Sequence, residues 1–124
     1  MTAPPSAIQE EAVLRDRRTD RLGLEAMLEG LSFRASRRLR PFGLSAGTVT
    51  VEVRRTDGPV RRTESVEPGI EDEETGRAVV LSLAAPILEP AAGVRGLVVR
   101  LGRLHRPRPQ ASLFPLRPGF ARQG

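Results

Sequence analysis

The longest regular pattern in the chain is a series of apolar residues at three- and four-residue steps between positions 20 and 40. Such residues share one side of a helix, as in an amphipathic helix; they are Leu24, Met27, Leu28, Leu31, Ala35 and Leu39. Thr19 or Asp20 is a suitable N-cap residue, and Pro41 disfavours helical geometry at the residue before it. We therefore expect a helix that begins near Asp20 and ends near Leu39.

Strict alternation of apolar and polar residues predicts a strand over residues 48–54. The three valines of this segment would face a core, while Thr48, Thr50, Glu52 and Arg54 would face outward. The pair Asp57-Gly58 is typical of a hairpin turn. We expect residues 60–66 to form the partner strand, with both of its faces as candidates for solvent exposure, and Pro68-Gly69 to break it.

A second helix and two further strands complete the pattern. Carboxylates crowd residues 71–74, where the dipole of a helix start favours them. Four residues continue at helical spacing up to a proline at position 86, which should end or kink the helix: Ala78, Leu81, Ala85 and Leu88. Residues 94–104 alternate, with Leu97, Val99 and Leu101 on one face and Gly96, Val98, Arg100 and Gly102 on the other. Residues 7–15 form a candidate first strand with apolar bulk at Ala12, Val13 and Leu14.

This order of elements predicts an α+β fold. A four-stranded antiparallel sheet in the order β-α-β-β-α-β would carry two helices on one face and leave the other face open. We expect residues 1–6 to be a linker or disordered N-terminus and residues 7–104 to form the domain. Residues 105–124, rich in proline and arginine, would be a flexible tail.

Charge changes the picture because all 20 basic residues are arginine, a side chain that can hold a phosphate with two hydrogen bonds. The net charge of +5 is unevenly spread: it is −2 over residues 1–33, +6 over 34–62, −6 over 63–92 and +7 over 93–124. Such blocks favour a polyanionic partner. The alternative is a solvated surface that reflects GC-rich coding.

Several classes of site are not supported by the composition. The chain has no cysteine, and we read it as cytoplasmic, with no apolar run of membrane-spanning length. His105 is the only histidine and lacks ligating neighbours, so we expect no metal site, and Glu71–Glu74 are interpreted as a solvated helix start. No strand-borne pair of carboxylates suits two magnesium ions. We therefore expect no catalytic residues, cofactor or small-molecule substrate on this chain.

In these segments the chain resembles the little-finger domain of Y-family translesion DNA polymerases, over residues 6–116. The resemblance rests on Ala7-Ile8 with Glu11, on Arg37-Arg38-Leu39-Arg40 at the helix end, on residues 48–54, on residues 94–104 and on Gln110-Ala-Ser-Leu-Phe114. It implies a ferredoxin-like fold and a role in DNA repair, close to the nucleoid. Val98 stands where the family usually has glycine, so the backbone is expected to approach DNA less closely there.

The resemblance implies that the open sheet face holds double-stranded primer-template DNA by its backbone. Arg100 is the first candidate for a phosphate contact, with Arg95 and Arg103 at the strand ends. The remaining candidates lie around the hairpin: Arg54, Arg61 and Arg62, with Thr50 and Thr63 as hydroxyl donors. Phosphate contacts position a protein without reading sequence.

The resemblance also implies a docking peptide for the bacterial sliding clamp at residues 110–114. Gln110, Leu113 and Phe114 fit the family's Q-x-x-L-F form, in which an amide and two apolar anchors enter a pocket, and Ser112 lies within it. Ala111 replaces the favoured leucine, which should lower affinity. Other polymerase or mutasome subunits are further implied partners.

Three alternatives remain to be compared. An RNA-recognition sheet would stack bases on aromatic residues, yet none of the four phenylalanines lies in an expected strand. A small hydrolase of ferredoxin-like fold would need an anion-binding glycine loop, and none is present. The serious alternative is a protein–protein adaptor that binds the clamp and another polymerase subunit but not DNA.

Overall fold

The structure is a computed structural model that describes residues 3–15 and 20–107. The elements follow the predicted order, with a short 3-10 turn after each helix. They are β1 (Ile8–Val13), α1 (Arg21–Arg37), η1 (Arg40–Phe42), β2 (Ser45–Arg55), β3 (Gly58–Ile70), α2 (Glu73–Ala84), η2 (Ala85–Ile87) and β4 (Val94–His105).

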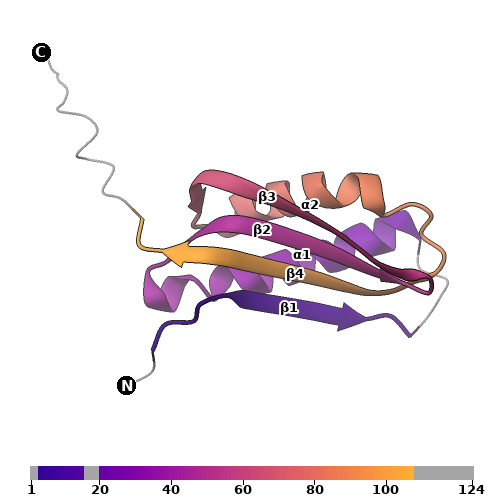
Figure 1. The fold of residues 1–124 in the computed structure, drawn as a ribbon, viewed down its shortest axis with the longest axis horizontal. Helices are drawn as coiled ribbons and strands as arrows, with labels where there is room; N and C mark the ends of the chain where they lie inside the picture. The colour runs from indigo at the N-terminus through magenta and orange to yellow at the C-terminus, as the bar shows by residue number, and fades with distance from the viewer. Residues whose placement is uncertain (1–2, 16–19, 108–124) are drawn as a thin grey trace, which may run out of the picture.

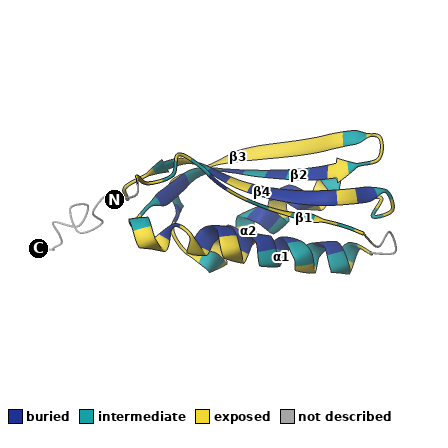
Figure 2. Ribbon diagram, turned by 90° about the horizontal axis from the view of Figure 1, so that it is seen from below, coloured by how far each residue is buried: buried dark blue, intermediate teal, exposed yellow. Residues whose placement is uncertain are grey.

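The four strands form one antiparallel sheet in the order β1-β4-β2-β3, so the last strand lies between the first and the second (Figure 1). Helix α1 packs against β1 and β4, and α2 packs against β2 and β3. Figure 2 shows both helices on the same side of the sheet, and no described helix covers the other side. The predicted α+β architecture is therefore confirmed.

The core lies between the two layers, where the alternation of β2 and β4 places apolar side chains. Fully or almost fully buried strand residues are Val49, Val51, Val53, Leu97, Val99 and Leu101. They share one cluster with Leu24, Leu28, Leu31 and Ala35 of α1 and with Leu39, which follows this helix. Burial of one such large side chain stabilises the fold by roughly 1.5–3 kcal/mol, so the predicted stripe and alternation identify the main source of stability.

Helix α1 begins as predicted at Asp20, whose carboxylate accepts a hydrogen bond from the backbone N–H of Gly23 at 2.9 Å. Thr19, the other candidate cap, lies outside the described residues. The α-helix ends at Arg37, and the chain continues through η1 to Gly43, which has φ 60° in the left-handed region. Because glycine adopts this conformation without steric cost, the segment turns there and leads into β2.

Strand β3 differs from the prediction because it does not stop before Pro68-Gly69. It continues to Ile70, and the pairing with β2 shifts between the Thr48–Ser65 and Ala46–Ile70 pairs. The irregularity accommodates Pro68 within the strand. Because β3 is an edge strand with a single neighbour, the backbone N–H that proline lacks is not needed for pairing. The edge position, which the sequence pattern did not reveal, is the physical reason for the longer strand.

The buried face of α2 was predicted only in part. Of the four predicted residues, Leu88 is buried and Leu81 packs against the core, whereas Ala78 and Ala85 are exposed. The buried residues of the helix itself are Gly76, Val80, Leu83 and Ala84. The helix is short and apolar on most of its circumference, so its own periodicity does not select a face, and packing on β2 and β3 selects it. The expected acidic start is confirmed, with Asp72 as N-cap and Glu73 and Glu74 in the first turn, and the helix ends before Pro86.

Strand β1 is shorter than the predicted segment and its apolar face differs. Ile8 is buried in the core, whereas Val13 is 71% exposed. Glu10 lies on the helix side of the sheet and forms ion pairs with Arg34 of α1 and with Arg38, the C-cap residue of this helix. These ion pairs explain why a polar residue stands at a position that faces α1. Within the described residues, neither helix is long and apolar enough to cross a membrane.

Candidate nucleic-acid interface

Pairing across the sheet aligns the outward-facing side chains of the open face in two rows. In the first row Gln9, Arg100, Thr50 and Thr63 lie opposite one another on the four strands. In the second row Glu11, Val98, Glu52 and Arg61 do so. Arg54 lies at the next outward position of β2, opposite Gly96. Five of the predicted DNA-contacting residues therefore share one surface: Thr50, Arg54, Arg61, Thr63 and Arg100.

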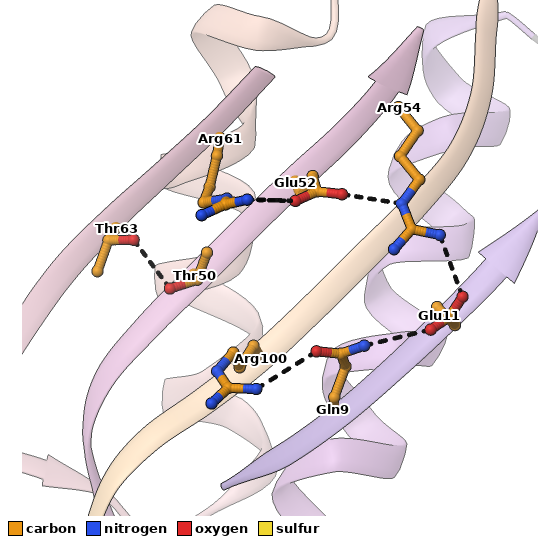
Figure 3. Close-up of polar contacts among 8 residues, drawn as sticks. All are labelled: Gln9, Glu11, Thr50, Glu52, Arg54, Arg61, Thr63 and Arg100. Atoms are coloured by element: carbon orange, nitrogen blue, oxygen red, sulfur yellow. Dashed lines mark hydrogen bonds and ion pairs between the residues drawn. The ribbon is translucent and has the colours of Figure 1, made fainter. Parts of the chain in front are cut away.

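The first row is polar and carries a single charge. The guanidinium of Arg100 lies 3.5 Å from the amide oxygen of Gln9, and the hydroxyls of Thr50 and Thr63 are 2.8 Å apart (Figure 3). Among the described residues, no carboxylate forms an ion pair with Arg100. This row can therefore offer a guanidinium and two hydroxyls to an anion without first breaking an ion pair.

The second row is strongly paired. Glu52 accepts a hydrogen bond from Arg54 at 2.8 Å and lies 3.2 Å from the guanidinium of Arg61. The other end of Arg54 reaches Glu11 at 3.2 Å (Figure 3). The hydrogen bond from Arg54, followed by the charge of Arg54 and the contact with Arg61, lowers the pKa of Glu52 against the opposing effect of burial. The carboxylate is therefore ionised at neutral pH.

Two glycines of β4 keep the face low on the outer side of each row. A side chain at position 96 would meet the backbone oxygen of Ala12 at 3.2 Å and the Cδ of Arg54 at 3.5 Å. A side chain at position 102 would meet the hydroxyl of Thr48 at 2.7 Å. Between them Val98 is only 6% exposed, so the one apolar side chain in the middle of β4 adds little free apolar surface to the face.

Three of the predicted arginines lie away from this surface. Arg62 points to the helix side, where its guanidinium donates to the carbonyl oxygen of Leu83 at 3.1 Å. Arg95 and Arg103 lie near the two ends of β4, as predicted; Arg95 borders a depression lined by Leu14 and Thr56. Arg103 is exposed and has a positive φ of 48°. The structure thus separates these residues from the group around Arg100.

Gln9, Glu11 and Glu52 were not among the predicted site residues, although they determine the geometry of the face. Glu52 was expected to point outward, but its two arginine partners follow only from the pairing of β2 with β3 and from the position of Arg54. Gln9 and Glu11 join the site through β1, which pairs with a strand about 90 residues later. The available signal was the polar side of the segment 8–13, which the poor alternation obscured.

The clamp-peptide prediction lies outside the described residues. It concerns Gln110, Ser112, Leu113 and Phe114, and the structure describes residues up to 107. Within the described residues no group of three or more histidine, aspartate or glutamate side chains is placed to hold a metal ion. The chemistry that the described face offers is the binding of anions by guanidinium and hydroxyl groups.

Comparison with known proteins assigns the fold and the family. The family model described as the impB/mucB/samB family C-terminal domain matches residues 5–113. The solved structure titled a post-insertion binary complex of Dbh DNA polymerase superposes with a TM-score of 0.68 at 16% identity, over 81% of this chain and 29% of that chain. A Y-family DNA polymerase chimera of Dbh and Dpo4 gives 0.67 at 14% identity, over 82% and 29%.

The chain spans less than a third of the length of these polymerase structures. At these identities the superpositions show a shared fold. A comparison with curated protein sequences finds no match. The family model, in contrast, covers nearly the whole described domain, with its open sheet and its paired helices. The chain therefore belongs to the impB/mucB/samB C-terminal domain family and is a little-finger domain of the Y-family DNA polymerases.

Proposed function

We propose that the open sheet face binds the backbone of double-stranded DNA without sequence preference, in the context of translesion synthesis, and that this chain contributes no catalytic step. The observation that carries the proposal is the position of Arg100 on a face that no described helix covers, with no carboxylate partner among the described residues. A guanidinium in this state can form two charge-assisted hydrogen bonds with a phosphate.

The surroundings of Arg100 support the same proposal. Thr50 and Thr63 present hydroxyls in the same row, and such groups commonly donate to phosphate oxygens. Gly96 and Gly102 leave β4 low on either side of Arg100, which favours contact with a broad surface such as a duplex backbone. The similar fold in a structure titled a polymerase complex is consistent with this use of the face.

We further propose that residues 110–114 dock on the bacterial sliding clamp. The support is the sequence form itself: an amide at Gln110 and adjacent apolar anchors at Leu113 and Phe114, in a segment that follows β4. Burial of two large apolar anchors in a pocket is a usual source of binding energy for a short peptide. The peptide and the DNA face would then be separate attachments on one chain.

The first experiment compares Arg100→Ala with Arg77→Ala in binding to primer-template DNA. Both variants lose one positive charge, but Arg77 lies on α2 and pairs with Glu29. Loss of one phosphate contact should weaken binding about tenfold, which corresponds to about 1.4 kcal/mol. It should also flatten the slope of log affinity against log salt by about 1. Arg77→Ala should change affinity less than about twofold.

Fluorescence anisotropy at several salt concentrations measures both quantities. Arg100→Ala should weaken binding to the same degree on unrelated DNA sequences, because a phosphate contact does not read bases. A wild-type affinity that does not depend on salt would contradict binding through phosphates. Absence of DNA binding by the wild type would favour the adaptor alternative, in which the domain binds another polymerase subunit rather than DNA. Equal losses in the two variants would contradict a special role of Arg100.

A further inference from the structure

The open face carries one continuous chain of polar contacts that crosses all four strands (Figure 3). Each member donates to or accepts from the next, and the donor–acceptor distances between neighbours range from 2.8 to 3.5 Å. We call it the ion-pair chain; its members are Arg61, Glu52, Arg54, Glu11, Gln9 and Arg100. It contains both carboxylates and three of the arginines of the proposed DNA surface.

The ion-pair chain divides the face into two unequal parts. Arg54 and Arg61 are held by Glu52 and Glu11, so this part is close to neutral. Within residues 3–15 and 20–107, the side chain of Arg100 forms a hydrogen bond with the neutral amide of Gln9 and no ion pair, so no carboxylate there compensates its charge. A phosphate can approach Arg100 directly, whereas a phosphate at Arg54 or Arg61 must compete with a carboxylate that already occupies the guanidinium.

Glu52 occupies the central place in this arrangement. Its side chain is 15% exposed and is held between Arg54 and Arg61, one on each side. Glu52 lies directly opposite Val98 on β4 and opposite Arg61 on β3. A phosphate that approaches either arginine would therefore meet the like charge of this carboxylate.

We propose that Glu52, assisted by Glu11, acts as an internal competitor of the DNA phosphates and limits how tightly the open face holds DNA. The inference rests on the proposed function. Arg100 is then the anchor of the face, and Arg54 and Arg61 contribute little until their carboxylate partners are removed. A domain that must hold DNA without stopping its movement benefits from such a limit, because a lower affinity allows release and rebinding along the backbone.

The test replaces Glu52 by glutamine, which keeps the shape of the side chain and removes its charge. The matched control is Glu64→Gln, which makes the same change in net charge. Glu64 is exposed, but it lies opposite Val49 on β2 and so belongs to the helix side of the sheet. We expect Glu52→Gln to bind primer-template DNA at least about fivefold tighter than wild type. The salt slope should steepen by about 1–2, as one or two more phosphates are neutralised. Glu64→Gln should gain less than about twofold.

A double-variant comparison separates competition from a general charge effect. In the wild-type background Arg61→Ala should change DNA affinity less than about twofold. In the Glu52→Gln background the same substitution should remove most of the gained affinity, because Arg61 is then free to contact phosphate. Circular dichroism checks that each variant is folded, and Glu11→Gln provides a second, smaller gain at a position on the edge strand β1.

The outcomes distinguish the inference from the proposed function. Equal gains of DNA affinity in Glu52→Gln and Glu64→Gln would overturn the inference. Weaker DNA binding by folded Glu52→Gln and Glu11→Gln would also overturn it, because the carboxylates would then pre-position the arginines for DNA. If the wild type binds DNA in either case, the proposed function stands without the inference. If wild type and both variants fail to bind, the proposed function fails and the inference fails with it.

Discussion

At the scale of single residues, Gly69 shows how close contact and backbone conformation combine at one position. It has φ 138°, a value that side-chain-bearing residues rarely adopt. A Cβ at this position would lie 2.2 Å from the hydroxyl of Ser45 and 3.1 Å from the carbonyl oxygen of Ala46. Glycine is therefore required where β3 bends past Pro68 and packs onto the start of β2.

Gly69→Ala should therefore lower the free energy of unfolding by about 2–4 kcal/mol, from backbone strain of about 1–3 kcal/mol and an added steric clash. The matched control is Gly58→Ala in the hairpin turn, where φ is 124° but no atom lies within 4 Å of the added Cβ. The control should show the strain alone. Urea denaturation measures both, and equal losses in the two variants would contradict the role of the contact with Ser45.

At the scale of elements, the N-terminus of α2 is stabilised by Asp72. Its carboxylate accepts a hydrogen bond from the backbone N–H of Thr75 at 2.7 Å, and this bond lowers the pKa of Asp72 from the usual 3.8. Since the folded state favours the ionised form, the stabilisation is fully present above the unfolded pKa. It is lost as the pH falls through the lower pKa of the folded protein.

Asp72→Ala should cost about 1 kcal/mol at pH 7, the usual effect of removing an N-cap side chain. The difference from wild type should shrink as the pH is lowered below about 4, where the wild-type carboxylate becomes protonated. Urea denaturation at a series of pH values measures this dependence. Glu71→Ala, one residue before the cap, serves as the control and should change stability by less than about 0.5 kcal/mol. A pH-independent loss in Asp72→Ala would argue against the cap.

Elements with a strong internal pattern were predictable, and elements shaped by their neighbours were not. The alternation of β2 placed Thr50 and Arg54 on the outer face, where the structure has them. The face of α2 depended on the sheet beneath it, and the length of β3 depended on its edge position. The same limit applies to the site: Arg100 could be predicted from β4 alone. Its neighbour Gln9 required the pairing of β1 with β4.

At the scale of the whole molecule, seven of the fifteen described arginines form ion pairs with carboxylates. On the helix side Arg34 and Arg38 pair with Glu10, Arg40 with Glu73 and Arg77 with Glu29. The net charge of +5 therefore does not spread evenly over the surface. Positive charge remains where described arginines lack a carboxylate partner, and on the open face this is the row that contains Arg100. Electrostatic binding of DNA should thus depend on this face.

The two proposed attachments differ in their physics, so they should be separable. Contacts with DNA phosphates weaken steeply as salt increases, whereas burial of apolar anchors in a clamp pocket depends little on salt. Leu113→Ala combined with Phe114→Ala should reduce clamp binding by at least about 100-fold, since each buried anchor contributes roughly 1.5–3 kcal/mol. DNA affinity should stay within about twofold of wild type.

A second apolar pair in the same tail makes the assignment of the clamp peptide specific. Leu116→Ala combined with Phe120→Ala removes similar apolar area beyond residues 110–114 and should leave clamp affinity within about threefold. Surface plasmon resonance on immobilised clamp at two salt concentrations measures both pairs. Only the Leu113–Phe114 pair has the spacing from Gln110 that a peptide pocket would select, so the two double variants should differ. Equal losses of clamp affinity would mean that the tail binds by general apolarity. Unchanged affinity in Leu113→Ala/Phe114→Ala would refute clamp docking by this peptide while leaving the DNA face untouched.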